Sequence, residues 1–551
     1  MKFLKIALIS VSLPLSVFAE RLIYPEGNIA LSSKTGNALE QVSAQMGLGL
    51  DANSFELKET KQSLLGNHYY YQQVLNGHEV EGAQVVVSID SQGKILKVYN
   101  NQVKAESKMQ LAAIPMISEQ MALDLAWSHL KVTGELLDLP TAELVYNTDL
   151  KLVYKITISS SAPFGHFVVQ MDATNGEVLA IEDAALPRMK RATAPVVNLK
   201  GKALFNSLSS AVKAYEQKHP KNFLVNEINF VNGTAQVFDP NPVVTLGRTD
   251  LENDSDASVF LQAYKNEDLK DISFVNGVYS LKGPKVTLID FENPYVEPSN
   301  SSDGSWIHDR GNEAFNDAMT YLHIDRSIRY IESMGFTGSR SVFPRTLEVD
   351  ANGVNGDDNS HYIPSSRRLA FGHGCVDDNE DADVILHELG HAIQHHINSS
   401  WRGGDTGAMG EGFGDYWAAS YSVTTENGNT GNINWVFKWD GHNACWGGRK
   451  LNAFSPVYNS MRSYSAHSQV DGGISDELWS TPIFQAFLEL YGNGVSRGDI
   501  DKIILEAHFG LGSGIKMPEM AKSIVKAAKA LFPNQDYDQV YLKHFKKQKI
   551  L

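Results

Sequence analysis

The sequence has few cysteines, no excess of basic residues and only one long apolar run. Two cysteines occur among 551 residues, so at most one disulfide can form within the chain. Acidic residues outnumber basic ones, 64 to 48, giving a net charge of −16, which argues against nucleic-acid binding because that function favours clustered Lys and Arg. No repeat or low-complexity tract is evident. Hydrophobic residues make up 42% of the chain, enough for sizeable cores, and the length predicts roughly three or four globular domains.

The single long apolar run lies at the amino terminus. Residues 1–19 combine Lys2 and Lys5 with an apolar stretch from Ile6 to Phe18 and end in Val-Phe-Ala, a small-residue cleavage site. This pattern predicts a secretory signal peptide, and its lysines indicate a bacterial source. No other stretch reaches about 18 consecutive apolar residues, the length that spans a membrane. We therefore expect a secreted protein, extracellular or periplasmic, without a membrane anchor.

The motif that carries chemistry is VILHELGHAIQ, residues 384–394. Its apolar residues recur at helical spacing, which predicts a helix with one buried face. His387 and His391 are four residues apart, so on a helix both imidazoles can bind one zinc ion. Glu388 then lies beside the metal, where a carboxylate can take a proton from zinc-bound water. The motif predicts peptide-bond hydrolysis; the alternative is a helix with surface histidines.

A catalytic zinc ion needs a third protein ligand and an open position. The extended motif HExxHxxGxxH is excluded, because Gln394 and Ile397 stand where its Gly and His would be. The other common ligand is a glutamate on a following helix, and GAMGEGFGDYWA supplies Glu411. Asp415, one turn further on, would share the face of Glu411 and accept the free N–H of a ligand histidine. The alternative for Asp415 is a solvated or capping carboxylate.

Together, HELGH, GAMGEGFGDYWA and the upstream GTAQVFDPNP resemble the fungalysin-type zinc metalloproteases, relatives of thermolysin within the gluzincins. The resemblance covers most of the chain. It implies zinc ligation by His387, His391 and Glu411, with Glu388 as general base and Asp415 orienting a ligand histidine. It also implies an α+β fold in which the active-site helix lies between a sheet-containing upper lobe and a helical lower lobe. Protein or peptide substrates would bind in the cleft.

The resemblance extends to residues around the expected cleft. DDNSHY and LAFGHG are similar to the strand pair that closes its upper side, which implies that Asn359 and Ser360 contact the substrate backbone; an ordinary hairpin is the alternative. His467 lies in a segment similar to that of the family's oxyanion-binding histidine, and one such donor contributes about 3–4 kcal/mol. The alternative for His467 is a structural role. Arg449 is a further candidate for contacting the substrate carbonyl, or else a salt-bridging arginine.

Two features concern stability rather than catalysis. Cys375 and Cys445 form an even pair in an oxidising compartment, so they are candidates for one disulfide; two buried free thiols are the alternative. Asp383 matches a calcium-binding aspartate of thermolysin-like relatives, so the resemblance implies a structural Ca²⁺ ion. Carboxylates at a helix start are also favoured as caps, and no full set of partner carboxylates is evident downstream.

The amino-terminal part predicts a precursor. Residues 68–101 alternate apolar and polar side chains between Asn-Gly and Gln-Gly turns, the signature of β-hairpins. Residues 20–110 are similar to the propeptide of fungalysin and thermolysin precursors. Residues 111–186 combine one helical segment with strands and resemble the PepSY module. Such modules chaperone and inhibit the protease that follows them, so the chain's own propeptide is an expected partner.

Residues 187–199 form a basic, Pro-bounded connector, which predicts an exposed linker in which maturation takes place; a plain interdomain linker is the alternative. The zinc metalloprotease domain would then comprise residues 200–551. We expect a secreted zinc endopeptidase made as a zymogen. A zinc-binding adhesin without catalysis would keep the histidines but has no need of Glu388. A secreted inhibitor or chaperone would use the amino-terminal modules alone.

Overall fold

The computed structural model describes residues 21–31, 38–104, 111–187, 203–219 and 228–551. The predicted signal peptide and most of the linker at 187–199 lie outside these residues. Within them the fold is α+β, as predicted, with eleven α-helices and three sheets of five or more strands. None of the described helices is long and apolar enough to cross a membrane.

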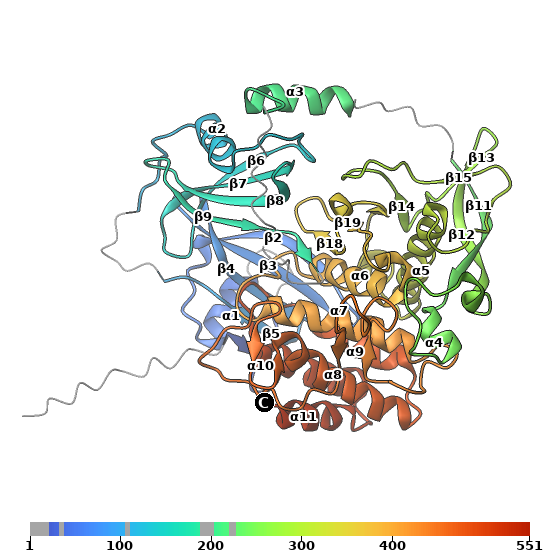
Figure 1. The fold of residues 1–551 in the computed structure, drawn as a ribbon. Helices are drawn as coiled ribbons and strands as arrows, with labels where there is room; N and C mark the ends of the chain where they lie inside the picture. The colour runs from blue at the N-terminus through green and yellow to red at the C-terminus, as the bar shows by residue number, and fades with distance from the viewer. Residues whose placement is uncertain (1–20, 32–37, 105–110, 188–202, 220–227) are drawn as a thin grey trace, which may run out of the picture.

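The first part of the chain forms a hairpin-rich sheet covered by one helix (Figure 1). Its elements are β1 (Leu22–Ile23), α1 (Ala38–Met46), β2 (Phe55–Gln62), β3 (Asn67–Leu75), β4 (His78–Ile89) and β5 (Ile95–Asn100). The predicted Asn-Gly turn joins β3 to β4, and both Asn76 and Gly77 have the positive φ that such a turn requires. Leu39 and Val42 of α1 share a buried core with Val85 of β4.

The second part continues the same nine-stranded sheet, because β4 bridges to β6 between Val80 and Tyr146. Its elements are α2 (Glu119–Leu130), β6 (Thr141–Tyr146), β7 (Leu152–Ser161), β8 (Phe164–Asp172) and β9 (Val178–Asp183). The following helix α3 (Leu208–Lys218) packs here as well, since Leu208 and Ala211 belong to the core of this part. By packing, α3 therefore adjoins the part predicted to be a PepSY-like module, although its residues fall in the range predicted for the catalytic domain.

The remainder of the chain contains two five-stranded sheets. One has the order β15-β13-β12-β11-β16 and the other the order β10-β18-β19-β17-β14. The first comprises β11 (Asn229–Phe238), β12 (Tyr264–Val275), β13 (Val278–Ser280), β15 (Asn300–Ser301) and β16 (Ser305–Trp306), with the short helix α4 (Pro242–Leu246) after β11. The second comprises β10 (Leu186–Pro187), β14 (Val286–Leu288), β17 (Leu347–Asp350), β18 (Ser360–Ile363) and β19 (Arg368–Phe371). The predicted strand pair is thus present as β18 and β19, which run antiparallel.

Helices make up most of the carboxy-terminal part. They are α5 (Glu313–Ser333), α6 (Ala382–Ile397), α7 (Thr406–Ser422), α8 (Ser475–Gly492), α9 (Arg497–His508), α10 (Met517–Leu531) and α11 (Tyr537–Lys547). Short strands also pair, β20 (Trp435–Val436) with β21 (Arg449–Lys450) and β22 (Gln469–Val470) with β23 (Gly473–Ile474). Helix α6 lies at the centre, contacting β18 and β19 on one side and α7 on the other, with α8 to α11 beyond α7 (Figure 1).

Helix α8 begins earlier than its sequence predicts. The pattern predicts a helix from Pro482 to Tyr491, because proline favours a first turn, but the helix begins at Ser475 and contains Pro482. Glu477 accepts the backbone N–H of Ile474 at 3.4 Å and so caps the earlier start. Burial of the first turns outweighs the single backbone hydrogen bond that Pro482 cannot make.

A disulfide links the segment before α6 to the loop before β21. Cys375 and Cys445 are bonded, with their Cα atoms 6.1 Å apart. This confirms the predicted bridge over the alternative of two free thiols. The bridge ties the segment before α6 to the segment that carries Arg449.

Candidate metal centre

The three predicted zinc ligands come together between α6 and α7. Nε2 of His387 lies 3.5 Å from Glu411 Oε2, and Nε2 of His391 lies 3.4 Å from Glu411 Oε1. The two imidazole rings are 5.0 Å apart and nearly perpendicular, at 85°. All three side chains are buried. The spacing within α6 and the packing of α7 on it therefore place two nitrogens and one carboxylate around a common point.

Two glycines allow α6 and α7 to approach so closely. A Cβ atom on Gly390 would lie 2.8 Å from the Cα of Gly414, and one on Gly414 would lie 2.6 Å from Nδ1 of His387. Since side-chain size at the contact sets the distance between two packed helices, any larger residue here would push the ligands apart.

The site fits a divalent metal. The Nε2 atoms of His387 and His391 are buried and have no hydrogen-bond partner among the described residues. Glu388, Glu411 and Asp415 add buried carboxylates, and buried negative charge is costly unless a cation balances it. Burial lowers the pKa of His387, but Asp415 and Glu411 outweigh it and raise that pKa to about 9. The site therefore attracts positive charge, and its nitrogen and oxygen donors suit zinc.

The predicted base and orienting carboxylate lie on the same two helices. Glu388 follows His387 on α6 and is fully buried. Oδ1 of Asp415 lies 3.0 Å from Nδ1 of His387, the position predicted for a carboxylate that fixes the tautomer of a ligand histidine.

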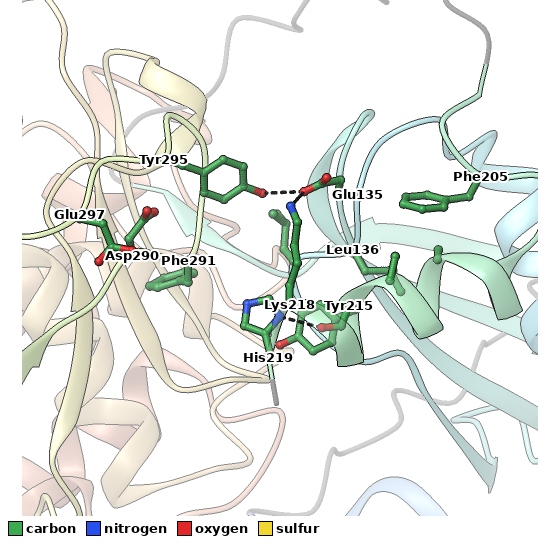
Figure 2. A pocket seen from close by; sticks show the side chains of 13 residues that line it. Glu135, Leu136, Phe205, Tyr215, Lys218, His219, Asp290, Phe291, Tyr295 and Glu297 are labelled. Carbon is green, nitrogen blue, oxygen red and sulfur yellow. Dashed lines mark hydrogen bonds and ion pairs between the residues drawn. The ribbon is translucent and has the colours of Figure 1, made fainter. Parts of the chain in front are cut away.

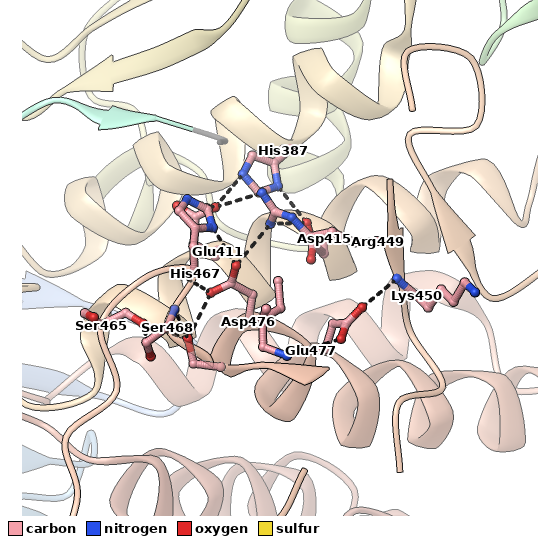
Figure 3. A network of polar contacts seen from close by, with 12 residues as sticks. His387, Glu411, Asp415, Arg449, Lys450, Ser465, His467, Ser468, Asp476 and Glu477 are labelled. Atoms are coloured by element: carbon pink, nitrogen blue, oxygen red, sulfur yellow. Dashed lines mark hydrogen bonds and ion pairs between the residues drawn. The ribbon is translucent and has the colours of Figure 1, made fainter. Parts of the chain in front are cut away.

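Arg449 holds the carboxylates of this site rather than facing outward. Its Nη1 donates to Asp415 Oδ1 at 2.9 Å and its Nη2 to Glu411 Oε2 at 3.1 Å (Figure 3). The guanidinium stacks over Phe437, and the side chain is 3% exposed. Of the two roles considered for Arg449, these contacts match the salt-bridging one; substrate contact stays a prediction.

His467 reaches the same site from the segment before α8. Its Nδ1 lies 2.7 Å from Asp476 Oδ2, and its backbone N–H donates to Asp476 Oδ1 at 2.9 Å. Nε2 lies 3.7 Å from Glu411 Oε2. Burial lowers the pKa of His467, but Glu411 and Asp476 outweigh it and the net pKa is raised. The contact of Asp476 with His467 was not predicted from the sequence. The signal that could have pointed to it is an acidic residue in the first turn of α8.

The strand expected to bind substrate already has a partner in this chain. One edge of β18 pairs with β19. Along the other edge, Leu186 and Pro187 of β10 pair antiparallel with Tyr362 and His361 of β18. Ser360 is fully buried, and its hydroxyl donates to Asp378. The predicted contacts of Ser360 and its neighbour Asn359 with substrate stay predictions.

Asp383, the predicted calcium ligand, accepts a hydrogen bond from the backbone. Its Oδ2 accepts the N–H of Phe437 at 3.1 Å. Burial and the neighbouring Asp381 raise the pKa of Asp383 to about 7. Among the described residues it belongs to no group of three metal-ligating side chains; the acidic group found there is Asp358, Asp378 and Asp440. Calcium at Asp383 stays a prediction.

A cavity of about 270 Å³ lies apart from the metal centre. Glu135 and Tyr215 line it on the side of the PepSY-like module and α3, and Asp290 and Tyr295 line it on the other side (Figure 2). Burial raises the pKa of Asp290 to about 6. No residue of the metal centre lines this cavity.

The fold and this site define an α+β protein with a buried His-His-Glu group that could hold a metal ion. Residues 53–102 match the fungalysin/thermolysin propeptide motif. The chain therefore carries this motif, and the match confirms the predicted resemblance to the fungalysin/thermolysin family.

Two solved structures show weaker likeness. The precursor of protealysin, a metalloproteinase from Serratia proteamaculans, is 14% identical with a TM-score of 0.35, covering 48% of this chain and 87% of that chain. The C-terminal domain of Bacillus megaterium YpeB is 11% identical with a TM-score of 0.17, covering 29% of this chain and 70% of that chain. At such scores neither structure establishes the fold of this chain. No curated protein matches it.

Proposed function

We propose that this protein is a secreted zinc-dependent endopeptidase made as a zymogen, with a two-lobed, thermolysin-like catalytic part. The observation that carries the proposal is the buried convergence of His387, His391 and Glu411, with Glu388 on the same helix, in a chain that bears a protease propeptide motif. Its substrates would be proteins or peptides.

His387, His391 and Glu411 would hold the zinc ion. When bound, zinc supplies a Lewis acid that polarises the scissile carbonyl and lowers the pKa of water to about 7. Glu388 removes the proton from the attacking water and returns it to the leaving amine. Nε2–H of His467 donates to the developing oxyanion, while Asp476 holds the proton on Nδ1.

Two further residues keep this machinery in place. Asp415 fixes the ring of His387 through Nδ1. Arg449 carries the positive charge that lets Asp415 and Glu411 stay ionised in a buried site. Through these two contacts Arg449 positions the ligands.

The pro-region would block the substrate edge of the catalytic part. An extended peptide binds a sheet edge by adding one more strand. Because Leu186 and Pro187 occupy the edge of β18, a substrate can pair there only after the pro-region has left. Cutting within residues 187–199 would begin that release, and amino-terminal sequencing of the mature form tests the position.

The decisive experiment compares the wild type with Glu388→Gln. The full-length proteins are incubated until the wild type matures, and casein hydrolysis and bound zinc are measured on each, with a chelator control. Glu388→Gln should keep one zinc at the His387 site yet lose about 10²–10⁴-fold in kcat/KM. The exposed Glu426→Gln serves as the matched control and should behave as wild type.

Two results would contradict the proposal. Full activity of Glu388→Gln would remove the base from the mechanism. A wild type that binds zinc but cleaves no protein, even after the pro-region is removed, would favour the zinc-binding adhesin instead.

A further inference from the structure

A second cluster of metal-ligating side chains lies where the pro-region meets the catalytic part. Nε2 of His166 lies 2.9 Å from Glu292 Oε1, and Nε2 of His361 lies 3.0 Å from the same oxygen. The exposed fractions of the three side chains are 4% or less. His166 is on β8, Glu292 follows β14, and His361 is on β18. The cluster thus joins segments on opposite sides of the predicted maturation linker.

This cluster repeats the donor set and the ring arrangement of the catalytic site. The rings of His166 and His361 are 5.4 Å apart at 86°, against 5.0 Å and 85° for His387 and His391. In both places two imidazole Nε2 atoms face one buried carboxylate. Two ring nitrogens can share one ion only if the rings are suitably oriented. The similar ring geometry of the two clusters therefore favours metal binding at the second one.

Neighbouring groups hold two of the three side chains of the cluster, as they do in metal sites. Nδ1 of His166 lies 2.9 Å from Ser159 Oγ, which fixes the ring through its other nitrogen. Oε2 of Glu292 accepts the N–H of Val354 at 2.9 Å. Nδ1 of His361 is buried without a hydrogen-bond partner among the described residues. Two things therefore place the ring of His361. They are packing and its contact with Glu292, the one polar side chain of the described residues that holds it.

Charge also favours a cation here. The carboxylate of Glu292 is fully buried, and buried negative charge is costly unless positive charge lies beside it. Asp350 accepts the backbone N–H of Glu292 at 2.9 Å and adds a second buried carboxyl beside the cluster. A divalent ion bound by His166, His361 and Glu292 would supply the positive charge that balances the buried carboxylate of Glu292.

We propose that His166, Glu292 and His361 form a second site for zinc or a similar divalent transition metal, which clamps the pro-region onto the catalytic part. An ion with bonds of about 2.0–2.2 Å sets its tetrahedral ligand atoms about 3.3–3.6 Å apart. The present separations of 2.9–3.1 Å therefore need to open by only a few tenths of an ångström. His361 lies opposite Pro187 in the β10–β18 pair. The clamp would therefore hold the pro-region where it covers the edge of β18 that is proposed to bind substrate. This consequence rests on the proposed protease function, while the metal site does not.

The test counts zinc in full-length protein that cannot mature. Glu388→Gln protein is prepared with excess ZnCl₂, free ions are removed by gel filtration, and zinc per chain is measured by mass spectrometry. Two ions are expected. Adding His166→Gln, which keeps an N–H donor for Glu292 but removes the imidazole, should leave one. The exposed His129→Gln is the matched control and should leave two.

A second variant leaves the cluster intact and removes the catalytic ligands. His387→Ala/His391→Ala protein should still hold one ion, and His166→Gln should abolish it. If Glu388→Gln protein holds one ion whether or not His166→Gln is present, the second site does not exist and the cluster is a hydrogen-bonded contact. If instead the single ion is lost with His166→Gln and kept in the His387→Ala/His391→Ala protein, the clamp stands and the proposed catalytic zinc falls.

Discussion

The carboxylate of Asp415 lies 3.0 Å from Nδ1 of His387, so a residue on α7 fixes the ring of a predicted metal ligand on α6. Asp415→Asn removes the negative charge and can present an N–H where an acceptor is needed. We expect zinc affinity and kcat/KM to fall by about 10–100-fold. Zinc competition titrations and peptide hydrolysis measure both, with the exposed Asp254→Asn as control. Unchanged zinc affinity in Asp415→Asn would show that this contact does not orient the ligand.

His467 is predicted to act on the transition state. Its Nε2 lies toward Glu411 while Asp476 holds Nδ1. His467→Phe should lower kcat by about 10²–10³-fold with little change in KM, because an oxyanion donor acts mainly in the transition state. Asp476→Asn should have a smaller effect of the same kind. Steady-state kinetics on one peptide at several concentrations separate the two constants, and bound zinc should stay at the wild-type level. A change confined to KM would assign His467 to substrate binding.

Because α6 and α7 pack closely, we expect one added methyl group between them to disturb the site. A Cβ on Gly414 would lie 2.6 Å from Nδ1 of His387, whereas one on Gly492 of α8 would meet nothing within 4 Å. Gly414→Ala should therefore displace His387, reduce bound zinc and destabilise the fold by about 1–3 kcal/mol. Gly492→Ala should be neutral or slightly stabilising. Urea unfolding and zinc content measure the pair, and equal behaviour of both variants would show that the contact relaxes freely.

Buried His508 predicts loss of stability in acid. Its Nδ1 lies 2.8 Å from the carbonyl of Ile504 and its Nε2 lies 3.0 Å from the amide of Gln394. Burial lowers the pKa of His508 to about 4, below its unfolded value of about 6.5. The unfolded chain therefore takes up the proton first, and stability falls as the pH drops from 6.5 towards 4.

The matched variants isolate that contribution. As the pH falls from 6.5 towards 4, the free energy of unfolding should fall less steeply in His508→Gln than in the parent. The difference in slope should be about 1.4 kcal/mol per pH unit, or about 2 kcal/mol between pH 6.5 and 5. Urea unfolding of full-length Glu388→Gln protein at several pH values gives the slopes. Exposed His129→Gln should leave the slope unchanged. Parallel slopes for His508→Gln and its parent would assign the acid sensitivity to other groups.

Much of the site was predictable because its signals are local. His387, Glu388 and His391 lie within one helical turn, and the helix that carries them follows from apolar periodicity. Glu411 and Asp415 likewise share one face of the next helix. The start of α8 was misplaced, because Pro482 is a strong local signal whose effect is overridden by burial and by the cap at Glu477.

The sequence by itself determined the donor set of the candidate metal centre, the amino-terminal β-hairpins and the cysteine pair, because each depends on residue types at short or countable spacings. Only the tertiary structure decided that Arg449 faces the carboxylates of the site, that Leu186 and Pro187 cover the edge of β18, and that His166 meets Glu292 and His361. These contacts join segments tens to hundreds of residues apart. They arise from how whole sheets and helices pack, and no periodicity or spacing along the chain encodes that arrangement.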